Sequence, residues 1–127
     1  MRNKKKERVQ TMKYSKDGLY IEKTGDEYRI GLSEKGQDDV GDVIFADIKA
    51  SENIKKGDFL IGLEGGKAVS DLYSPLTGRI VKVNEQLSNF PERLNSEAKS
   101  RNWILVLTDV DEAEYADLED ESGFIED

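Results

Sequence analysis

The chain has 127 residues, a net charge of −8 at pH 7, and equal shares of hydrophobic and charged residues, 36% each. This length suits one compact domain with a single core, and the acidic balance argues against nucleic-acid binding, which needs a basic face. The sequence contains neither Cys nor His, which excludes disulfides and thiolate metal sites and disfavours a self-sufficient hydrolase or zinc enzyme.

The two ends of the chain carry opposite charge. Residues 1–16 hold seven Lys or Arg and one Glu, whereas residues 109–127 hold ten Asp or Glu and no basic residue. Charged ends of this kind are typical of solvated segments, and nucleic-acid binding by the basic end is the less favoured alternative. The expected division is therefore a flexible basic segment over 1–11, one folded domain over 12–118 and an acidic segment over 119–127.

The sequence gives no indication of a membrane or export segment. The residues after the basic N-terminus are too few and too polar for the apolar part of a signal peptide. No apolar run approaches the roughly 20 residues that a membrane-spanning helix needs. We therefore expect a cytoplasmic protein that does not bind membranes.

The first half of the domain shows short strands and one helix. Gly25 and Asp26 are turn formers between two β-type runs, which is a hairpin signal. Ser33 is suited to cap a short helix, Gly36 weakens that helix, and Gly41 is suited to end it. The expected elements are strands at 19–23 and 28–32, a helix through Asp39, and a strand at 43–48.

A turn followed by a strand then occurs twice. Lys56 and Gly57 precede a strand over 58–64, and Thr77 and Gly78 precede a strand over 79–84. Two such units packed face to face would make a flattened barrel or sandwich.

The remaining elements are short helical turns, one strong strand and a last helix. Trp103, Ile104 and Val106 belong to an aromatic and β-branched run, so we expect them in or beside the core. The class predicted from all elements is mainly β with small helices. The expected elements of this part are helical turns at 85–87 and 91–94, a strand at 103–108 and a helix at 111–118.

The informative segment runs from Leu63 to Pro75. Gly65 and Gly66 lie between a strand ending at Glu64 and another beginning near Ala68, and two glycines tolerate the positive φ angles of a type I′ turn. Lys67 is then exposed at a hairpin tip, where an ε-amine is suited to carry a cofactor in an amide bond. The alternative from the turn alone is an ordinary exposed lysine.

The residues around this lysine resemble a known family. Glu64 stands three residues before Lys67, and the run Lys67-Ala68-Val69-Ser70-Asp71-Leu72-Tyr73-Ser74-Pro75 is followed by Gly78. This is similar to the lipoylation segment of glycine cleavage H proteins, whose matching lysine bears lipoate. The resemblance covers about residues 12–118. It extends to Lys13-Tyr14-Ser15-Lys16, Gly41-Asp42-Val43, Asn84-Glu85, Pro91, Leu94-Asn95 and Trp103.

The resemblance implies a fold and a function. The fold is a flattened lipoyl-domain-type barrel or sandwich, a barrel-sandwich hybrid, with short peripheral helices. The protein is then no enzyme but a carrier with lipoate on Lys67, which shuttles an aminomethyl group. Implied partners are glycine decarboxylase, aminomethyltransferase, dihydrolipoamide dehydrogenase, and a lipoate ligase or lipoyltransferase. Glu64, Gly65, Gly66 and Asp71 adjoin the attachment site; Glu64 and Asp71 either contact the lipoylating enzyme or are solvated strand residues.

The chain departs from the family at two places. The family usually has His-Glu-Trp where this chain has Gly18-Leu19-Tyr20, near the region where the family docks its loaded arm, and a hydroxyl and a β-branched residue where Gly65 and Gly66 stand. Both departures resemble divergent H-like lipoyl proteins of some bacteria. A lipoyl protein acting in lipoate relay or in a redox or stress response is therefore one alternative, and an unmodified interaction domain is another.

Two other motifs fail on their residues. Gly66-Lys67 suggests a phosphate loop, but Ala68 stands where Ser or Thr must reach the magnesium ion. Asp109 and Asp111 begin like a calcium loop, but Ala113 occupies the third ligand position. An Asp at the start of the last helix is better explained as an N-cap.

Overall fold

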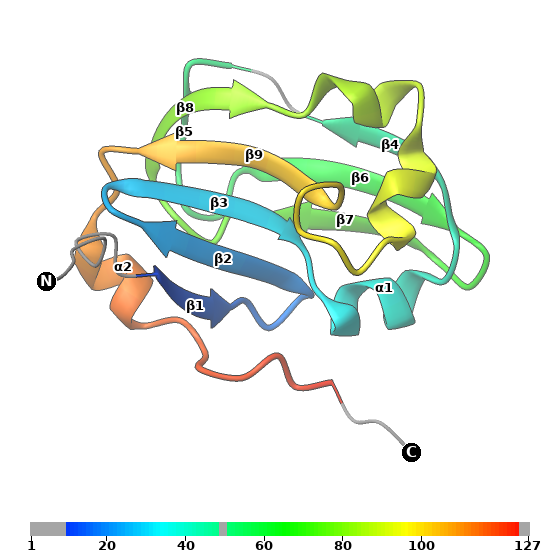
Figure 1. Cartoon of the computed structure of the whole chain (residues 1–127), viewed down its shortest axis with the longest axis horizontal. Helices are drawn as coiled ribbons and strands as arrows, with labels where there is room; N and C mark the ends of the chain where they lie inside the picture. The colour runs from blue at the N-terminus through cyan, green and yellow to red at the C-terminus, as the bar shows by residue number, and fades with distance from the viewer. Residues whose placement is uncertain (1–9, 49–50, 125–127) are drawn as a thin grey trace, which may run out of the picture.

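The computed structural model describes residues 10–48 and 51–124 of the chain, so residues 1–9 of the expected basic segment and 125–127 of the acidic one lie outside it. Two antiparallel sheets face each other (Figure 1). One has the strand order β1-β2-β3-β9-β8-β5 and the other the order β4-β6-β7. The elements are β1 Gln10–Tyr14, β2 Leu19–Thr24, β3 Glu27–Leu32, α1 Glu34–Val40, β4 Val43–Ile48, β5 Asn53–Ile54, β6 Phe59–Gly65, β7 Val69–Tyr73, β8 Gly78–Val83, η2 Glu85–Ser88, η3 Pro91–Asn95, β9 Trp103–Thr108 and α2 Glu112–Ala116.

The predicted class, a mainly β flattened barrel-sandwich with short helices, is confirmed. β6 and β8, the strands of the two similar turn-and-strand units, lie in different sheets. The sequence did not indicate β1 as a strand. Among the described strands, β2 alone pairs with β1, which lies at one edge of its sheet. Polar residues are tolerated at an edge, so β1 lacks a hydrophobic pattern. In the described part of the chain, no helix is long and apolar enough to span a membrane.

The core fills the space between the sheets. Each Leu or Ile that becomes fully buried contributes about 1.5–3 kcal/mol to folding. Because these side chains come from both sheets, they fix which face of each strand points outward. The largest fully buried side chains are Leu19, Ile21, Ile30, Leu32, Leu60, Ile61, Leu63, Leu76, Leu87, Leu94, Ile104 and Leu105.

β9 is the central strand of the larger sheet, between β3 and β8. Ile104 and Val106 are buried, as expected, and Trp103 is half-buried. The side chains of Trp103 and Val106 also line a groove on the outer face of the sheet. The register between β3 and β9 shifts at Ile30 and Gly31, where β9 carries one extra residue. This bulge changes which residues of β9 face outward, and a sequence pattern does not record it.

The helix predicted after Ser33 is present as α1. The Ser33 side chain accepts a hydrogen bond from the Gly36 backbone N–H at 3.2 Å, and Gly41 ends the helix with a φ of 83°. The same helix end then leads directly into β4. The capping signals therefore fixed both ends of α1, and the position of its C-terminal end matters for the site described below.

The C-terminal segment packs back onto the domain. Asp111 caps α2 by accepting from the Ala113 N–H at 2.9 Å, which confirms the N-cap. After α2, Glu119 pairs with Tyr14 of β1 through two backbone hydrogen bonds of 2.8 and 2.9 Å. The segment then runs below β1 toward α1 (Figure 1), where a Cβ on Gly123 would lie 3.6 Å from Lys35 Cδ.

Candidate functional site

The hairpin between β6 and β7 places Lys67 in its turn. β6 continues through Gly65, and the Gly65 N–H donates to the Ala68 carbonyl at 3.0 Å, so Gly66 and Lys67 form the tip. The expected type I′ turn is wrong, because neither glycine has a positive φ. The predicted strand end at Glu64 is one residue early. The turn conformation is set by contacts with α1 and not by glycine's freedom.

The C-terminal end of α1 holds the tip through backbone hydrogen bonds. The Lys67 N–H donates to the Val40 carbonyl at 2.8 Å, and the Gly66 N–H donates to the Asp42 carbonyl at 3.0 Å. These carbonyls belong to the helix end and the residues after it, where intrahelical donors are missing. Two successive N–H groups of the turn, those of Gly66 and Lys67, are therefore held by the end of α1 and the residues after it, which fixes the backbone of Lys67.

Two glycines make this close approach sterically allowed. A Cβ on Gly65 would lie 2.4 Å from Val40 Cγ1 and 2.5 Å from the Val40 carbonyl oxygen. A Cβ on Gly41 would lie 3.0 Å from both Cγ and the backbone N of Lys67. Gly66, by contrast, has open space around it. Gly65 and Gly41 therefore allow α1 to reach the tip.

The Lys67 side chain extends over the end of α1. Its Nζ donates to the Asp38 carbonyl at 3.0 Å and lies 3.4 Å from the Asp38 carboxylate oxygen Oδ1. The side chains are 62% and 58% exposed. An ion pair this exposed contributes at most about 1 kcal/mol, so an acylating enzyme can displace it at small cost.

Glu64 and Asp71 lie on the outward face of the smaller sheet. Both are exposed and alternate with buried Leu63 and Leu72. Glu64 pairs with Val69, next to the tip, whereas Asp71 pairs with Gly62, further along the hairpin. The structure therefore brings Glu64 closer to the tip than Asp71.

A groove of about 510 Å³ opens beside Lys67. It runs along α1 and includes residues from the loop after η3 and from the C-terminal segment. The sequence did not indicate Glu97 and Phe124, the residues from that loop and segment, because they are distant from Lys67 along the chain and belong to no motif. The lining residues are Glu34, Gln37, Asp38, Gly41, Asp42, Gly66, Lys67, Glu97 and Phe124.

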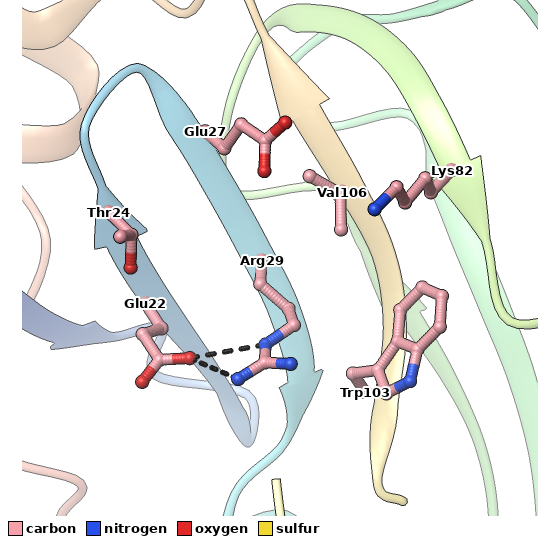
Figure 2. A pocket seen from close by; sticks show the side chains of 7 residues that line it. All are labelled: Glu22, Thr24, Glu27, Arg29, Lys82, Trp103 and Val106. Carbon is pink, nitrogen blue, oxygen red and sulfur yellow. Dashed lines mark hydrogen bonds and ion pairs between the residues drawn. The ribbon is translucent and has the colours of Figure 1, made fainter. Parts of the chain in front are cut away.

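A second groove, of about 340 Å³, lies on the outer face of the larger sheet (Figure 2). Arg29 donates to Glu22 Oε1 from Nε at 3.1 Å and from Nη2 at 2.6 Å. None of the lining residues comes from the β6–β7 hairpin, so this groove does not adjoin Lys67. Its lining is Glu22, Thr24, Glu27, Arg29, Lys82, Trp103 and Val106.

The described residues offer little other chemistry. They contain no group of three or more Asp, Glu, His or Cys side chains that could hold a metal ion. The amine of Lys67 lies exposed at the tip of the hairpin, where it can be acylated.

The segment Gly18 to Tyr20 offers no side chain to solvent. Leu19 is fully buried, and Tyr20 is 2% exposed. The Tyr20 hydroxyl donates to Asn102 Oδ1 at 2.8 Å, and burial raises the pKa of Tyr20 above its ordinary value. A Cβ on Gly18 would lie 2.5 Å from Gly36 Cα, so this loop sits directly on α1.

Comparisons with known proteins agree with the motif. The family described as "Glycine cleavage H-protein" matches residues 12–126. The glycine cleavage system H protein of Cronobacter sakazakii is 39% identical over 115 residues, which are 89% of this chain and 89% of that protein. The H protein of Thermotoga maritima is 33% identical over 115 residues, 90% of this chain and 93% of that one.

One solved structure is also similar. The crystal structure of a glycine cleavage system H protein from Mycobacterium marinum superposes with a TM-score of 0.67 at 25% sequence identity. The match covers 76% of this chain and 82% of that one. The similarity therefore extends over most of the fold and is not confined to the lysine segment.

Proposed function

The chain belongs to the glycine cleavage H-protein family, and from this premise we propose that Lys67 carries lipoate in an amide bond to its ε-amine. The protein acts as a lipoyl carrier of the glycine cleavage system, not as a catalyst. The observation that carries the assignment is the turn itself. An exposed lysine is common, but its backbone N–H is here bonded to Val40 at the end of a helix, so the side chain leaves the turn from a fixed backbone position.

The residues around Lys67 fit a lipoyl group. Acylation removes the charge of Nζ but leaves one N–H, which the Asp38 carbonyl can still accept. Among the contacts of Lys67 with described residues, the exposed pair with the Asp38 carboxylate is lost. When bound, lipoate would supply an oxidised dithiolane, whose S–S bond takes up two electrons and opens as one sulfur accepts the aminomethyl group, while the protein supplies position.

The surface around the tip suits brief encounters with several enzymes. Family membership implies interaction with glycine decarboxylase and aminomethyltransferase; we propose dihydrolipoamide dehydrogenase and a lipoate ligase or lipoyltransferase in addition. Glu64 and Asp71 are exposed beside the hairpin, and the net charge is −8. Charge complementarity raises the rate at which an acidic carrier associates with a basic partner and does not slow its dissociation. Glu64, next to the tip, is the stronger candidate for contact with the lipoylating enzyme.

The test is intact-mass analysis and peptide mapping of protein made with lipoate and the ligase of its own organism. Wild type is expected to gain one lipoyl group at Lys67, and Lys67→Arg none, because arginine keeps the charge but has no amine to acylate. Lys56→Arg is the matched control, since Lys56 is an exposed lysine beside the turn glycine Gly57. Unmodified wild type, or lipoate on another lysine, would overturn the assignment.

A second test moves the lysine by one position. In the double variant Gly66→Lys with Lys67→Gly, the amine leaves the backbone position that Val40 fixes. We expect lipoylation to be lost although a lysine remains at the tip. Full modification of this variant would show that the α1 contact is not what presents the amine.

The second candidate function is that of a divergent H-like lipoyl protein in lipoate relay or redox response. The buried Gly18-Leu19-Tyr20 segment favours it, because these residues replace the family's His-Glu-Trp and show no polar group to an arm. Lipoylated protein incubated with glycine decarboxylase and glycine separates the two. Aminomethyl loading on the arm supports the glycine cleavage carrier, and its absence supports the relay.

A further inference from the structure

The groove on the outer face of the larger sheet crosses four neighbouring strands. Arg29 of β3 lies opposite Glu22 of β2 and Val106 of β9. Val106 lies in turn opposite Lys82 of β8. The row therefore has a short apolar side chain between two long cationic ones, and this difference in length contributes to the groove (Figure 2). Its volume of about 340 Å³ lies within the roughly 300–1,000 Å³ of small-molecule sites.

Arg29 is a cation whose orientation is fixed before any ligand arrives. Glu22 is only 7% exposed, and its Oε1 accepts hydrogen bonds from Nε and Nη2 of Arg29 at 3.1 and 2.6 Å. The Arg29 side chain is still 34% exposed. Its third guanidinium nitrogen, Nη1, points away from Glu22 toward β9 (Figure 2). A guanidinium held in this way loses less side-chain entropy when an anion binds to it.

Lys82 supplies the net positive charge at the centre of the groove. Glu22 compensates the charge of Arg29, whereas none of the ion pairs among the described residues includes Lys82. The ammonium group of Lys82 extends over β9 toward Val106 (Figure 2). Neighbouring strands are about 4.8 Å apart, so an anion above Val106 is one strand spacing from β3 and one from β8.

The two ends of the groove select the rest of the ligand. Trp103 is half-buried and its indole lines one end, whereas the exposed carboxylate of Glu27 lies at the other (Figure 2). A flat ring stacks favourably on an indole. Glu27 repels a second negative charge, so a ligand with one carboxylate fits the groove better than a dicarboxylate or a polyphosphate.

We propose that this groove binds a small aromatic monocarboxylate, with its carboxylate between Arg29 and Lys82 and its ring against Trp103. The charge of the ligand is complementary to that of Lys82, and its ring is complementary to the indole. None of the lining residues comes from the β6–β7 hairpin. The site is therefore separate from the lipoyl attachment proposed for Lys67 and does not depend on it.

The first experiment uses Trp103 as a reporter, because it is the only tryptophan of the chain. Its fluorescence is followed while benzoate, the probe, is added to the full-length protein. We expect a saturable change with a dissociation constant on the order of 1 mM, which suits a ligand of one ring.

Three comparison compounds test which features of benzoate are recognised. Benzamide lacks the charge, cyclohexanecarboxylate lacks the flat ring, and terephthalate adds a second carboxylate. Each should bind at least about threefold more weakly than benzoate. Equal binding of any of the three, or a fluorescence change with benzoate that does not saturate, would overturn the inference.

The second experiment removes the charge of the groove. Lys82→Gln changes an exposed side chain and should weaken benzoate binding about tenfold, because one charge-assisted hydrogen bond is lost. Lys56→Gln is the matched control, since Lys56 is an exposed lysine outside the groove, and it should bind benzoate as wild type does. Urea unfolding verifies that both variants are folded. Equal affinity of Lys82→Gln and wild type would contradict the proposed site.

The third experiment locates the ligand by NMR of ¹⁵N-labelled protein. We expect benzoate to shift the amide signals of Arg29, Lys82 and Trp103, whereas shifts centred on Gly66 and Lys67 would show that it binds elsewhere. Lys67→Arg should bind benzoate as wild type does. Loss of lipoylation therefore leaves this inference standing, and loss of benzoate binding leaves the proposed function standing.

Discussion

The turns of the hairpins β2–β3 and β6–β7 are stabilised in different ways. In the first, Gly25 has a φ of 64° and no atom within 4 Å of its hypothetical Cβ, so its left-handed conformation is set locally, and the outside contact is the Thr108 hydroxyl on the Asp26 carbonyl at 3.3 Å. In the second, Gly66 and Lys67 have ordinary φ values. Lys67 donates a backbone hydrogen bond to Val40 at the end of α1, and Gly66 donates one to Asp42 just after it. One turn is local, and the other is imposed by tertiary contacts.

The difference shows what a carrier lysine requires. In a locally formed turn, no other element holds the backbone of the tip. The orientation of the tip then changes whenever its two strands bend. The β6–β7 turn is tied through the N–H groups of Lys67 and Gly66 to Val40, the last residue of α1, and to Asp42 just after it. An enzyme that reads the presentation of a lysine then meets one orientation, so less ordering entropy is lost on binding.

Gly65→Ala breaks the tertiary turn and should have the largest effect. The new Cβ would lie 2.4 Å from Val40 Cγ1 and 2.5 Å from a backbone oxygen that cannot move alone. Overpacking of this kind costs about 1–3 kcal/mol, and we expect about 2–3 kcal/mol here. Urea unfolding measures the stability, and intact mass measures a fall in lipoylation at Lys67. Unchanged stability would mean that α1 does not pack on the tip.

Tyr20→Phe tests whether the stability of the β2–β3 hairpin depends on contacts of its strands and not on its turn. The Tyr20 ring covers Gly31 across β2 and β3, and its hydroxyl bonds Asn102. Loss of this hydroxyl leaves a buried acceptor unpaired, at a cost of about 1–2 kcal/mol. Lipoylation of Lys67 should not change, and a loss of it would contradict the separation of the two hairpins.

The same tyrosine predicts a pH dependence. Burial raises its pKa above the ordinary value of 10.0. Its contribution to stability is therefore fully present below about pH 10 and is lost as the pH rises toward the folded-state pKa, because the unfolded state gives up the proton first. Chemical denaturation between pH 8 and pH 11, roughly the range around the ordinary value, should show a steeper loss for wild type than for Tyr20→Phe.

Gly25→Ala tests the local turn. Alanine at a φ of 64° is less stable in the left-handed conformation than glycine by about 1 kcal/mol. It causes no clash, because the space around it is open. Urea unfolding should show this moderate loss. A cost equal to that of Gly65→Ala would contradict the view that only the β6–β7 turn depends on neighbours.

Gly66→Ala should have the smallest effect. Gly66 has no positive φ and nothing within 4 Å of its hypothetical Cβ. We expect a change within about 0.5 kcal/mol, of either sign, and unchanged lipoylation by mass. Because Gly65 and Gly66 are neighbours of identical type, the contrast between their alanine variants isolates the α1 contact from the general flexibility of glycine.

Much of the fold could be predicted from the sequence, because many signals act locally, as the capping of α1 illustrates. Ser33 and Gly41 act on backbone groups within a few residues, so their effect on α1 does not depend on the rest of the chain. The Gly25 turn and the apolar strand around Leu105 are equally local signals. The lysine motif itself also lies within one continuous segment.

The tertiary structure alone decided the rest. Lys67 and Asp38 are 29 residues apart, and the contact of Gly65 with Val40, the bulge that turns Trp103 outward, and the place of Phe124 beside the lysine depend on how elements dock. Docking is set by the volume and shape of the whole core, to which every buried side chain contributes. The sequence therefore determined which lysine stands in the turn, and the packing of the core determined which surfaces that lysine meets.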